Sequence, residues 1–330
     1  MSEPLLQVED LVVQYPVPRG LVGTIARRPR ETVHAVDGVS FTLAAGEMVA
    51  LVGESGCGKT STAQAVMRLV EPEGGSIRFE DRDLTTIGAR GLRPLRRRVQ
   101  MVYQDPYESL DPRQRVRDAV AEPLLIHRLG GSREERATRV REALERVELS
   151  PPELFLDRFP HELSGGQRQR VAIAAALVLD PVLLVADEPV SMLDVSVRAG
   201  VLTLLDELKR TGLAILMITH DLSTAARFAD RIAVMYLGRI VEEGPAAQVV
   251  RAPQHPYTRA LLSVVPRRDP RERHTGVVLR GETPDAVRIP SGCRFHPRCP
   301  MAIEACKVEE PALEPTPAGH RAACSLIVRA

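Results

Sequence analysis

The stretch GESGCGKT, residues 53–60, decides the fold of this 330-residue chain. It fits the pattern G-x-x-x-x-G-K-[ST] in full, follows an apolar run at 48–53 and precedes a helical pattern that starts after Lys59. Because they lack a Cβ, the glycines let backbone N–H groups converge on phosphate oxygens, and the start of a helix adds partial positive charge. The pattern therefore predicts a phosphate-binding loop between a buried strand and a helix. A simple glycine-rich turn is the alternative.

The basic residue of this loop is a lysine in a chain that otherwise uses arginine. Only three of the 44 basic residues are lysines. A compact ammonium fits within a phosphate cradle. Lys59 is therefore predicted to reach the β- and γ-phosphates of a nucleotide, and the Thr60 hydroxyl to hold Mg²⁺. Cys57 is interpreted as a small filler residue. The residues predicted to surround the nucleotide are Gly53, Glu54, Ser55, Gly56, Cys57, Gly58, Lys59, Thr60 and Ser61.

Two adjacent acids end a second apolar run, VLLVADEP at 182–189. Asp187 is predicted to bind Mg²⁺, and Glu188 to polarise an attacking water as general base. Solvated acids at a strand end are the alternative, which a phosphate loop in the same predicted sheet disfavours. His220 ends a further apolar run and is predicted to contact the γ-phosphate. Gln104 is predicted to sense the metal and the water. A purely structural role is the alternative for both.

Strands alternate with helical patterns through the middle of the chain. Buried runs at 182–187 and 214–220 are separated by a helical segment at 198–210. Such alternation predicts a mostly parallel sheet covered on both faces. With the phosphate loop after a strand at 48–53, the expected fold class is α/β, a P-loop NTPase with a RecA-like core.

Other segments set the expected domain organisation. A strand pattern at 5–15 favours an antiparallel β portion near the N-terminus, and a loop insertion follows at 16–32. The charged, Arg-rich segment at roughly 90–165 is predicted to be a helical subdomain, and its stretch REERATRVREALERVEL is typical of a solvated amphipathic helix. The ATPase domain is expected over 1–250, followed by a C-terminal extension over 251–330.

The motif LSGGQ at 163–167 stands where a long helical pattern begins. With the features above, it resembles the ATP-binding cassette (ABC) superfamily. The resemblance implies that Ser164, Gly165, Gly166 and Gln167 lie at a helix N-terminus and donate hydrogen bonds to the γ-phosphate held by a partner subunit. ATP would then join two subunits, and its hydrolysis would weaken the contact. A glycine pair that only caps a helix is the alternative.

The same resemblance assigns further residues to the nucleotide. Tyr15 corresponds to the aromatic residue that stacks on adenine, with His34 as a rival because of the insertion that follows Tyr15. Gln104 matches the Q-loop, near which a permease helix docks. Asp194 belongs to SMLD, the match to the D-loop, in which Met192 stands where alanine is usual.

Longer stretches resemble the dipeptide and oligopeptide importer ATPases, and the likeness is closest to the second ATPase of a heterodimeric pair. They are GESGCGKT, YQDPYESLDPR (103–113), ADEPVSMLDVSVRA (186–199) and HPYTRALLSVVP (255–266). The resemblance implies a peripheral subunit at the cytoplasmic face of the membrane. Its partners would be a sister ATPase or a second copy, two permease subunits and, indirectly, a solute-binding protein. Relatives in this branch also carry nickel, short glycans or other solutes, so the cargo stays open.

Four cysteines follow in the proline-rich C-terminal part: Cys293, Cys299, Cys306 and Cys324. Clustered cysteines in a reducing compartment favour a metal over disulfides. Their gaps of five, six and seventeen residues lack the short knuckle typical of structural zinc. Some members of the importer branch hold a [4Fe–4S] cluster in a pattern similar to GCRFHPRCPMAIEAC. A [4Fe–4S] cluster is expected on this resemblance, Zn²⁺ and unligated cysteines are the alternatives, and His296 or His320 could replace a ligand.

Composition argues against several other classes. Lys plus Arg (44) nearly balances Asp plus Glu (43), and only 3% of residues are aromatic, so the chain offers neither a strong field nor stacking platforms for nucleic acid. No apolar run approaches the roughly 20 residues of a membrane-spanning helix, and the N-terminus lacks a signal-peptide pattern. A soluble ABC ATPase acting on nucleic acid is the rival hypothesis. Such chains usually carry two cassettes or a long coiled-coil insertion, and this sequence has neither.

Overall fold

The computed structural model describes residues 3–17, 31–105, 109–263 and 281–327. These residues belong to two compact units. The helical unit comprises Met1–Leu5, Leu43–Met48 and Thr86–Ile218, and the phosphate-loop unit comprises Leu6–Thr42, Val49–Thr85 and Thr219–Ala330.

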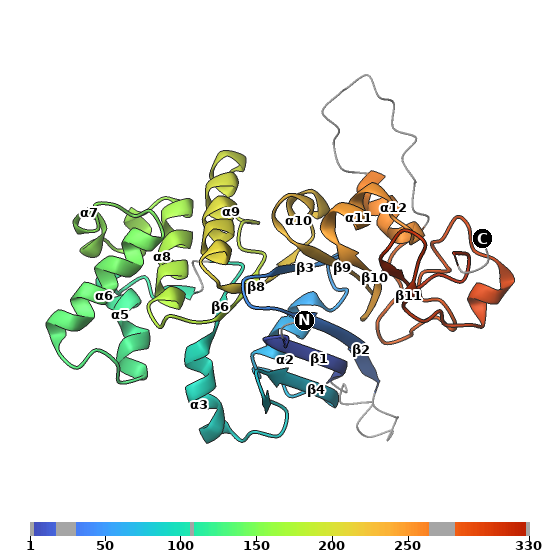
Figure 1. The fold of residues 1–330 in the computed structure, drawn as a ribbon, viewed down its shortest axis with the longest axis horizontal. Coiled ribbons are helices and arrows are strands. Elements are labelled where there is room, and N and C mark those ends of the chain that lie inside the picture. The colour runs from blue at the N-terminus through green and yellow to red at the C-terminus, as the bar shows by residue number, and fades with distance from the viewer. Residues whose placement is uncertain (1–2, 18–30, 106–108, 264–280, 328–330) are drawn as a thin grey trace, which may run out of the picture. The chain divides into compact units, whose positions relative to one another are not determined.

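The phosphate-loop unit contains a four-stranded sheet in the order β2-β1-β4-β5 (Figure 1). Its strands are β1 (Leu6–Pro16), β2 (Thr32–Leu43), β4 (Gly74–Phe79) and β5 (Arg82–Asp83). β1 and β4 pair antiparallel, with Val8 opposite Ile77, and both of these side chains are buried. The antiparallel portion predicted near the N-terminus is confirmed.

Further strands of this unit carry the phosphate loop. β3 (Met48–Val52) pairs in parallel with β9 (Arg231–Tyr236), which pairs antiparallel with β10 (Arg239–Pro245). All five residues of β3 are buried, which explains their continuous apolar run. The C-terminal extension adds to these strands, because β12 (Arg321–Ala322) pairs with β10 and β11 (Glu314–Pro315) pairs with β12.

The helices of the phosphate-loop unit follow the strands that they connect. They are α2 (Lys59–Val66), α10 (Leu222–Phe228), α11 (Ala246–Arg251), α12 (Pro256–Ser263) and a 3₁₀ helix at Glu304–Lys307. α2 begins at Lys59, directly after the glycines of the loop, as predicted.

The helical unit contains the parallel strands β6 (Val99–Val102), β7 (Leu183–Asp187) and β8 (Ala214–Thr219), paired in that order. Its helices are α3 (Ala89–Arg98), α5 (Val116–Ile126), α6 (Arg133–Arg146), α7 (Glu153–Leu156), a 3₁₀ helix at Pro160–Glu162, α8 (Gly165–Leu177) and α9 (Val195–Arg210). α5 packs against both α6 and α8 (Figure 1). Leu124, Leu144 and Ile173, one from each of these helices, are fully buried.

The expectation that residues 90–165 are helical is wrong at one place, because β6 lies inside this segment. The strand is only four residues long, VQMV, and only Val99 and Val102 are buried. Two buried positions directly after an arginine run are too few to produce a strand pattern in the sequence. In the ranges that the structure describes, no helix is long and apolar enough to cross a membrane.

Candidate nucleotide site

Two glycines of the phosphate loop are fixed by the backbone around them. Gly58 has a φ of 106° and is the N-cap of α2. A Cβ on Gly58 would lie 2.1 Å from the carbonyl oxygen of Ala35, and one on Gly53 would lie 2.2 Å from that of Met235. Such distances are far below contact, so the loop accepts no side chain at either position. Close packing is thus a second reason for these glycines, besides the access for phosphate that the sequence predicts.

Lys59 lies inside this loop. Its Nζ donates hydrogen bonds to the carbonyl oxygens of Gly53 (2.8 Å) and Glu54 (2.9 Å), and the residue is 5% exposed. The third proton of the ammonium faces Cys57 Sγ at 3.8 Å, and because sulfur is a weak acceptor, a phosphate oxygen would be the better partner for it. Burial raises the pKa of the Cys57 thiol, which keeps it neutral and fits its interpretation as a small filler. Ser55, Gly56 and Thr60 are exposed along the loop.

The two candidates for adenine stacking both lie on the N-terminal strands of the same unit. The Tyr15 hydroxyl donates to Ser61 Oγ over 3.4 Å, directly beside the phosphate loop. His34 Nδ1 lies 3.3 Å from Gln14 Nε2. Tyr15 is thus the candidate with a direct contact to the predicted nucleotide residues.

The acids predicted at the end of β7 belong to the helical unit. Asp187 is the last residue of β7 and is 5% exposed. Glu188 follows with a φ of 45°, so the chain turns sharply at this point, and its N–H donates to the Ile218 carbonyl (2.9 Å). Gln104 Nε2 donates to Glu188 Oε2 over 3.1 Å. The structure therefore brings Gln104 to the predicted general base.

His220 belongs to the phosphate-loop unit and is exposed directly after β8. The next residue, Asp221, caps α10 by accepting a hydrogen bond from Ser223 N–H (2.9 Å). The His220 backbone is therefore held between a strand end and a helix cap, which leaves the imidazole at the carboxyl end of the strand as predicted.

The LSGGQ segment opens α8 with a complete capping box. Ser164 is the N-cap, and its Oγ accepts from Gln167 N–H (3.3 Å), while Gln167 Oε1 accepts from Ser164 N–H (3.0 Å). A Cβ on Gly166 would lie 2.3 Å from Val197 Cγ1, so this glycine also serves packing against α9. Because Ser164 Oγ is an acceptor within its own chain, its proton remains available to an external acceptor. Asp194 is the N-cap residue of α9.

The four C-terminal cysteines do not support the predicted metal site. All four are free thiols, and the described residues contain no group of three or more His, Cys, Asp or Glu side chains placed to hold a metal ion. Burial raises the pKa of Cys293 to about 11, with smaller contributions from the other three thiols. Spacing along the sequence indicates a cluster, but it does not determine where the sulfur atoms point.

The two histidines considered as replacement ligands have other contacts. His296 Nδ1 lies 2.9 Å from the Cys293 carbonyl oxygen. His320 Nε2 lies 2.6 Å from Glu242 Oε1, with both side chains fully buried. The pair joins the extension to β10, so His320 serves as an anchor in this structure.

Sequence reasoning missed three residues of the extension that contact the phosphate loop. Arg298 forms a bidentate ion pair with Glu54, and Thr283 Oγ1 donates to the same carboxylate. Tyr257 Oη accepts a hydrogen bond from Glu54 N–H over 2.8 Å. Tyr257 lies in the stretch HPYTRALLSVVP (255–266), which indicates the family but no role for the tyrosine. No motif in the sequence connects Arg298 with Glu54.

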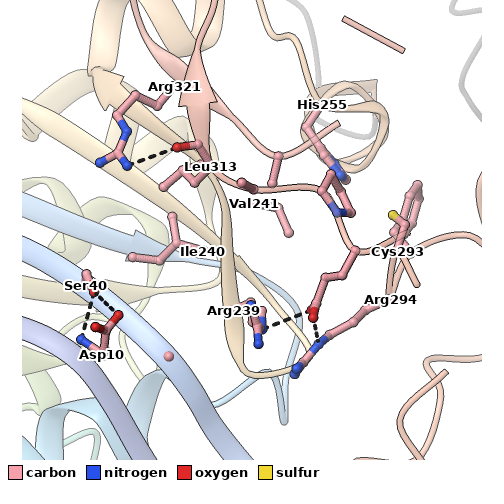
Figure 2. A pocket seen from close by; sticks show the side chains of 16 residues that line it. Asp10, Ser40, Arg239, Ile240, Val241, His255, Cys293, Arg294, Leu313 and Arg321 are labelled. Atoms are coloured by element: carbon pink, nitrogen blue, oxygen red, sulfur yellow. Dashed lines mark hydrogen bonds and ion pairs between the residues drawn. The ribbon is translucent and has the colours of Figure 1, made fainter. Parts of the chain in front are cut away.

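A cavity of about 350 Å³ lies beside the extension within the same unit (Figure 2). Arg239 and Arg294 both reach the Glu310 carboxylate, at 3.0 and 3.1 Å. Arg294 also ion-pairs with Asp37, and Arg321 donates to the Leu313 carbonyl (3.0 Å). The Arg239–Glu310 pair ties the extension to β10, and the Arg294–Asp37 pair ties it to β2.

The strand β3, the glycine loop with its buried Lys59 and the helix α2 together form the strand–G-x-x-x-x-G-K-[ST]–helix arrangement that defines a P-loop nucleoside triphosphatase. Comparisons with known proteins identify the family within this class. The family model for ABC transporters matches residues 36–191, and that for the oligopeptide/dipeptide transporter C-terminal region matches 241–306.

Curated relatives match along almost the whole chain. A putative peptide import ATP-binding protein of Brucella ovis is 47% identical over 322 residues, 97% of each chain. The oligopeptide transport ATP-binding protein AppF of Bacillus subtilis is 43% identical over 329 residues, 98% of each. The protein belongs to the ABC transporter family of ATP-binding proteins and is an ATPase of that type.

Solved structures agree with this assignment. The chain is similar to the ATP-binding cassette MJ0796 in a dimeric post-hydrolysis state bound to ADP and Pi, with a TM-score of 0.63 and 29% identity over 73% of this chain and 98% of that one. It is also similar to cbiO1 of Clostridium perfringens, part of the transporter complex cbiONQ, with a TM-score of 0.64 and 29% identity over 76% and 92%.

Proposed function

We propose that this chain is the ATP-hydrolysing subunit of a membrane importer and binds its nucleotide at residues 53–61. Lys59 and the loop N–H groups bind the phosphates, and Tyr15 stacks on adenine. The observation that carries the proposal is the loop geometry, in which Lys59 is buried among loop carbonyls and its third hydrogen bond goes only to the weak acceptor Cys57 Sγ. The ATPase domain is assigned to 1–250 and the extension to 251–330.

Hydrolysis uses residues at the strand ends. Mg²⁺ would be held by the Thr60 hydroxyl and the Asp187 carboxylate, with Gln104 nearby, and would neutralise phosphate charge. An exposed hydroxyl at a helix start and a buried strand-end carboxylate are oxygen ligands that suit this ion. Glu188 accepts the proton of the attacking water, oriented by the Gln104 amide. His220 contacts the γ-phosphate.

A second subunit completes the site. Its LSGGQ segment would offer the Ser164 hydroxyl and the first N–H groups of α8 to the γ-phosphate, and Asp194 would lie at the same contact. The capping box supports this role because it fixes the serine while leaving its proton free. The dimeric cassette among the similar structures supports a sandwich of two subunits. The partner is a sister ATPase or a second copy.

Two variants test the catalytic assignment. Glu188→Gln keeps its shape but cannot take a proton, so ATP binding persists while phosphate release falls about 10²- to 10⁴-fold. In gel filtration with Mg-ATP this variant should accumulate as a dimer. Lys59→Ala should lose nucleotide binding. Normal hydrolysis by Glu188→Gln removes Glu188 as base, and normal binding by Lys59→Ala contradicts the phosphate-loop assignment.

The helical unit offers a surface for permease subunits. A groove of about 400 Å³ between α5 and α6 is lined by Leu125, Val140 and Leu156 together with four arginines. Leu125 is 57% exposed. We assign this groove and the Q-loop residue Gln104 to permease docking at the cytoplasmic face of the membrane. Leu125→Glu should abolish co-purification with the permeases while nucleotide binding stays normal.

Peptides are the proposed cargo, since the relatives above are named for peptide and oligopeptide transport. Nickel, short glycans and other small solutes are the alternatives. Uptake assays with labelled peptides in cells lacking this ATPase distinguish them. ATPase rates that rise with DNA or RNA would instead favour the nucleic-acid rival.

The [4Fe–4S] hypothesis for the four C-terminal cysteines rests on their spacing and on the family resemblance. The described thiols form no ligand set. The nucleotide chemistry above does not depend on a cluster, because none of the residues assigned to it is one of these four cysteines. Iron and acid-labile sulfide in anaerobically purified protein would support the cluster. Zinc without sulfide would support the alternative metal, and protein without metal would support plain structural cysteines.

A further inference from the structure

Glu54, the second residue of the phosphate loop, is held by the C-terminal extension. Arg298 Nη1 and Nη2 donate to its two carboxylate oxygens over 2.6 and 3.0 Å. Thr283 Oγ1 adds a third hydrogen bond of 3.0 Å. The Arg298 side chain is 8% exposed, so the pair is shielded from water on that side. Bidentate, charge-assisted pairs are the most directional ion pairs in proteins.

The backbone of Glu54 is fixed as well. Its N–H donates to Tyr257 Oη over 2.8 Å, and its carbonyl oxygen accepts from Lys59 Nζ over 2.9 Å. The N–H, the carbonyl and the carboxylate of one residue are therefore all engaged, and the extension supplies the partners of two of them.

The extension residues that bind Glu54 are themselves held rigidly. Tyr257 is fully buried, and its ring packs against Tyr236 (4.7 Å between centroids) and Phe295 (5.5 Å). The Arg298 guanidinium lies 5.9 Å from the centroid of the Tyr236 ring. Large aromatic rings in mutual contact leave little freedom to the groups that they carry.

We propose that Arg298 and Tyr257 are positioning residues of the nucleotide site, which hold the start of the phosphate loop in its binding conformation. The proposal rests on the assignment of residues 53–61 to nucleotide binding. The loop N–H groups must converge before the phosphate arrives, and a loop that is competent for only part of the time binds more weakly by that fraction. The extension thereby sets the affinity of the protein for nucleotide.

The test measures the Kd of the full-length chain for Mg-ADP by calorimetry, because ADP occupies the loop without being hydrolysed. Arg298→Gln and Glu54→Gln should each raise Kd about tenfold, corresponding to about 1.4 kcal/mol. The double variant should bind no more weakly than either single variant, because both changes remove one interaction. Arg298→Lys, which keeps the charge but not the fork, should recover part of the affinity.

Arg321→Gln provides the matched control. It removes an ion pair of the same extension, that with Glu243 on β10 (3.1 Å), and touches nothing in the phosphate loop. It should leave Kd for Mg-ADP unchanged. Thermal unfolding of every variant accompanies the titrations. Should Arg298→Gln fail to fold, Tyr257→Phe tests the other contact, because it removes the acceptor of the Glu54 N–H and keeps the ring; it should by itself raise Kd for Mg-ADP, and an unchanged Kd in both Tyr257→Phe and Glu54→Gln would overturn the proposal.

Each outcome decides the matter. Unchanged affinity in Arg298→Gln and Glu54→Gln, or additive effects in the double variant, would overturn the proposal. An equal loss in Arg321→Gln would overturn it too, because the effect would then be general loosening of the extension. A wild-type chain that binds no Mg-ADP would refute the nucleotide assignment itself, a result distinct from all of these.

Discussion

His255 makes the stability of this protein depend on pH in a window that can be worked out from the structure. The residue is 1% exposed, and burial, with a smaller contribution from Arg259, lowers its pKa from 6.5 to about 3. The imidazole Nδ1 of His255 accepts a hydrogen bond from the backbone N–H of Tyr257 over 3.1 Å, and Glu242 Oε2 accepts one from the backbone N–H of His255. A proton on Nδ1 would face the Tyr257 N–H, so the folded protein keeps this imidazole neutral.

Proton linkage gives the direction in which the free energy of unfolding changes with pH. Below pH 6.5 the unfolded chain binds a proton at this histidine and the folded chain does not, so the free energy of unfolding falls as pH falls and stops falling near pH 3. The slope inside the window approaches about 1.4 kcal/mol per pH unit. Between pH 8 and pH 5 the loss from this one group is about 2 kcal/mol.

The substitution His255→Asn isolates the contribution of this histidine to the pH dependence of stability. An Asn Oδ1 can accept from Tyr257 N–H but takes up no proton, so the variant is less stable at every pH yet has a shallower pH dependence. Urea unfolding at pH 5 to 8, followed by tyrosine fluorescence because the chain lacks tryptophan, measures both slopes. The wild type should lose about 2 kcal/mol more than the variant over this range. Carboxylates cancel in this difference. Equal losses in the two proteins would refute the reasoning.

Three further substitutions test packing at the loop and at the LSGGQ helix. Gly58→Ala should abolish nucleotide binding, because its Cβ would meet the Ala35 carbonyl at 2.1 Å, and retained affinity in a filter-binding assay would contradict this. Ser164→Ala should cost about 1 kcal/mol in urea unfolding through loss of the N-cap. Gly166→Ala should destabilise by about 1–3 kcal/mol through the clash with Val197, and adding Val197→Ala should restore most of it.

The sequence predicts those parts of the site that depend on local pattern. The loop that contains Lys59 and the acids that end β7 are contiguous motifs, and a buried strand before each gives its setting. β6 escapes prediction because it has only two buried residues. The contacts of Glu54 with Tyr257 and Arg298 span 203 and 244 positions, and no local periodicity encodes such a distance.

For the four C-terminal cysteines, by contrast, the sequence predicts a site that the described residues do not form. Their spacing and a family resemblance predict a shared metal, yet the described thiols form no ligand set. Spacing limits how far apart two side chains can lie, whereas ligation depends on rotamers and on the path of the chain between them. The same segment holds Arg298, whose contact with the phosphate loop has no motif of its own.

The pairing of β12 with β10 covers Glu242 and Glu243 at the edge of the hairpin, which we expect to disfavour self-association. An uncovered β10 would present a row of free N–H and C=O groups, a template on which another chain can add its own strand. β12 covers part of this row, and the two-residue β11, paired with β12, becomes the outer strand there. A version of the protein cut before its last ten residues should therefore precipitate at concentrations where the full chain stays dispersed.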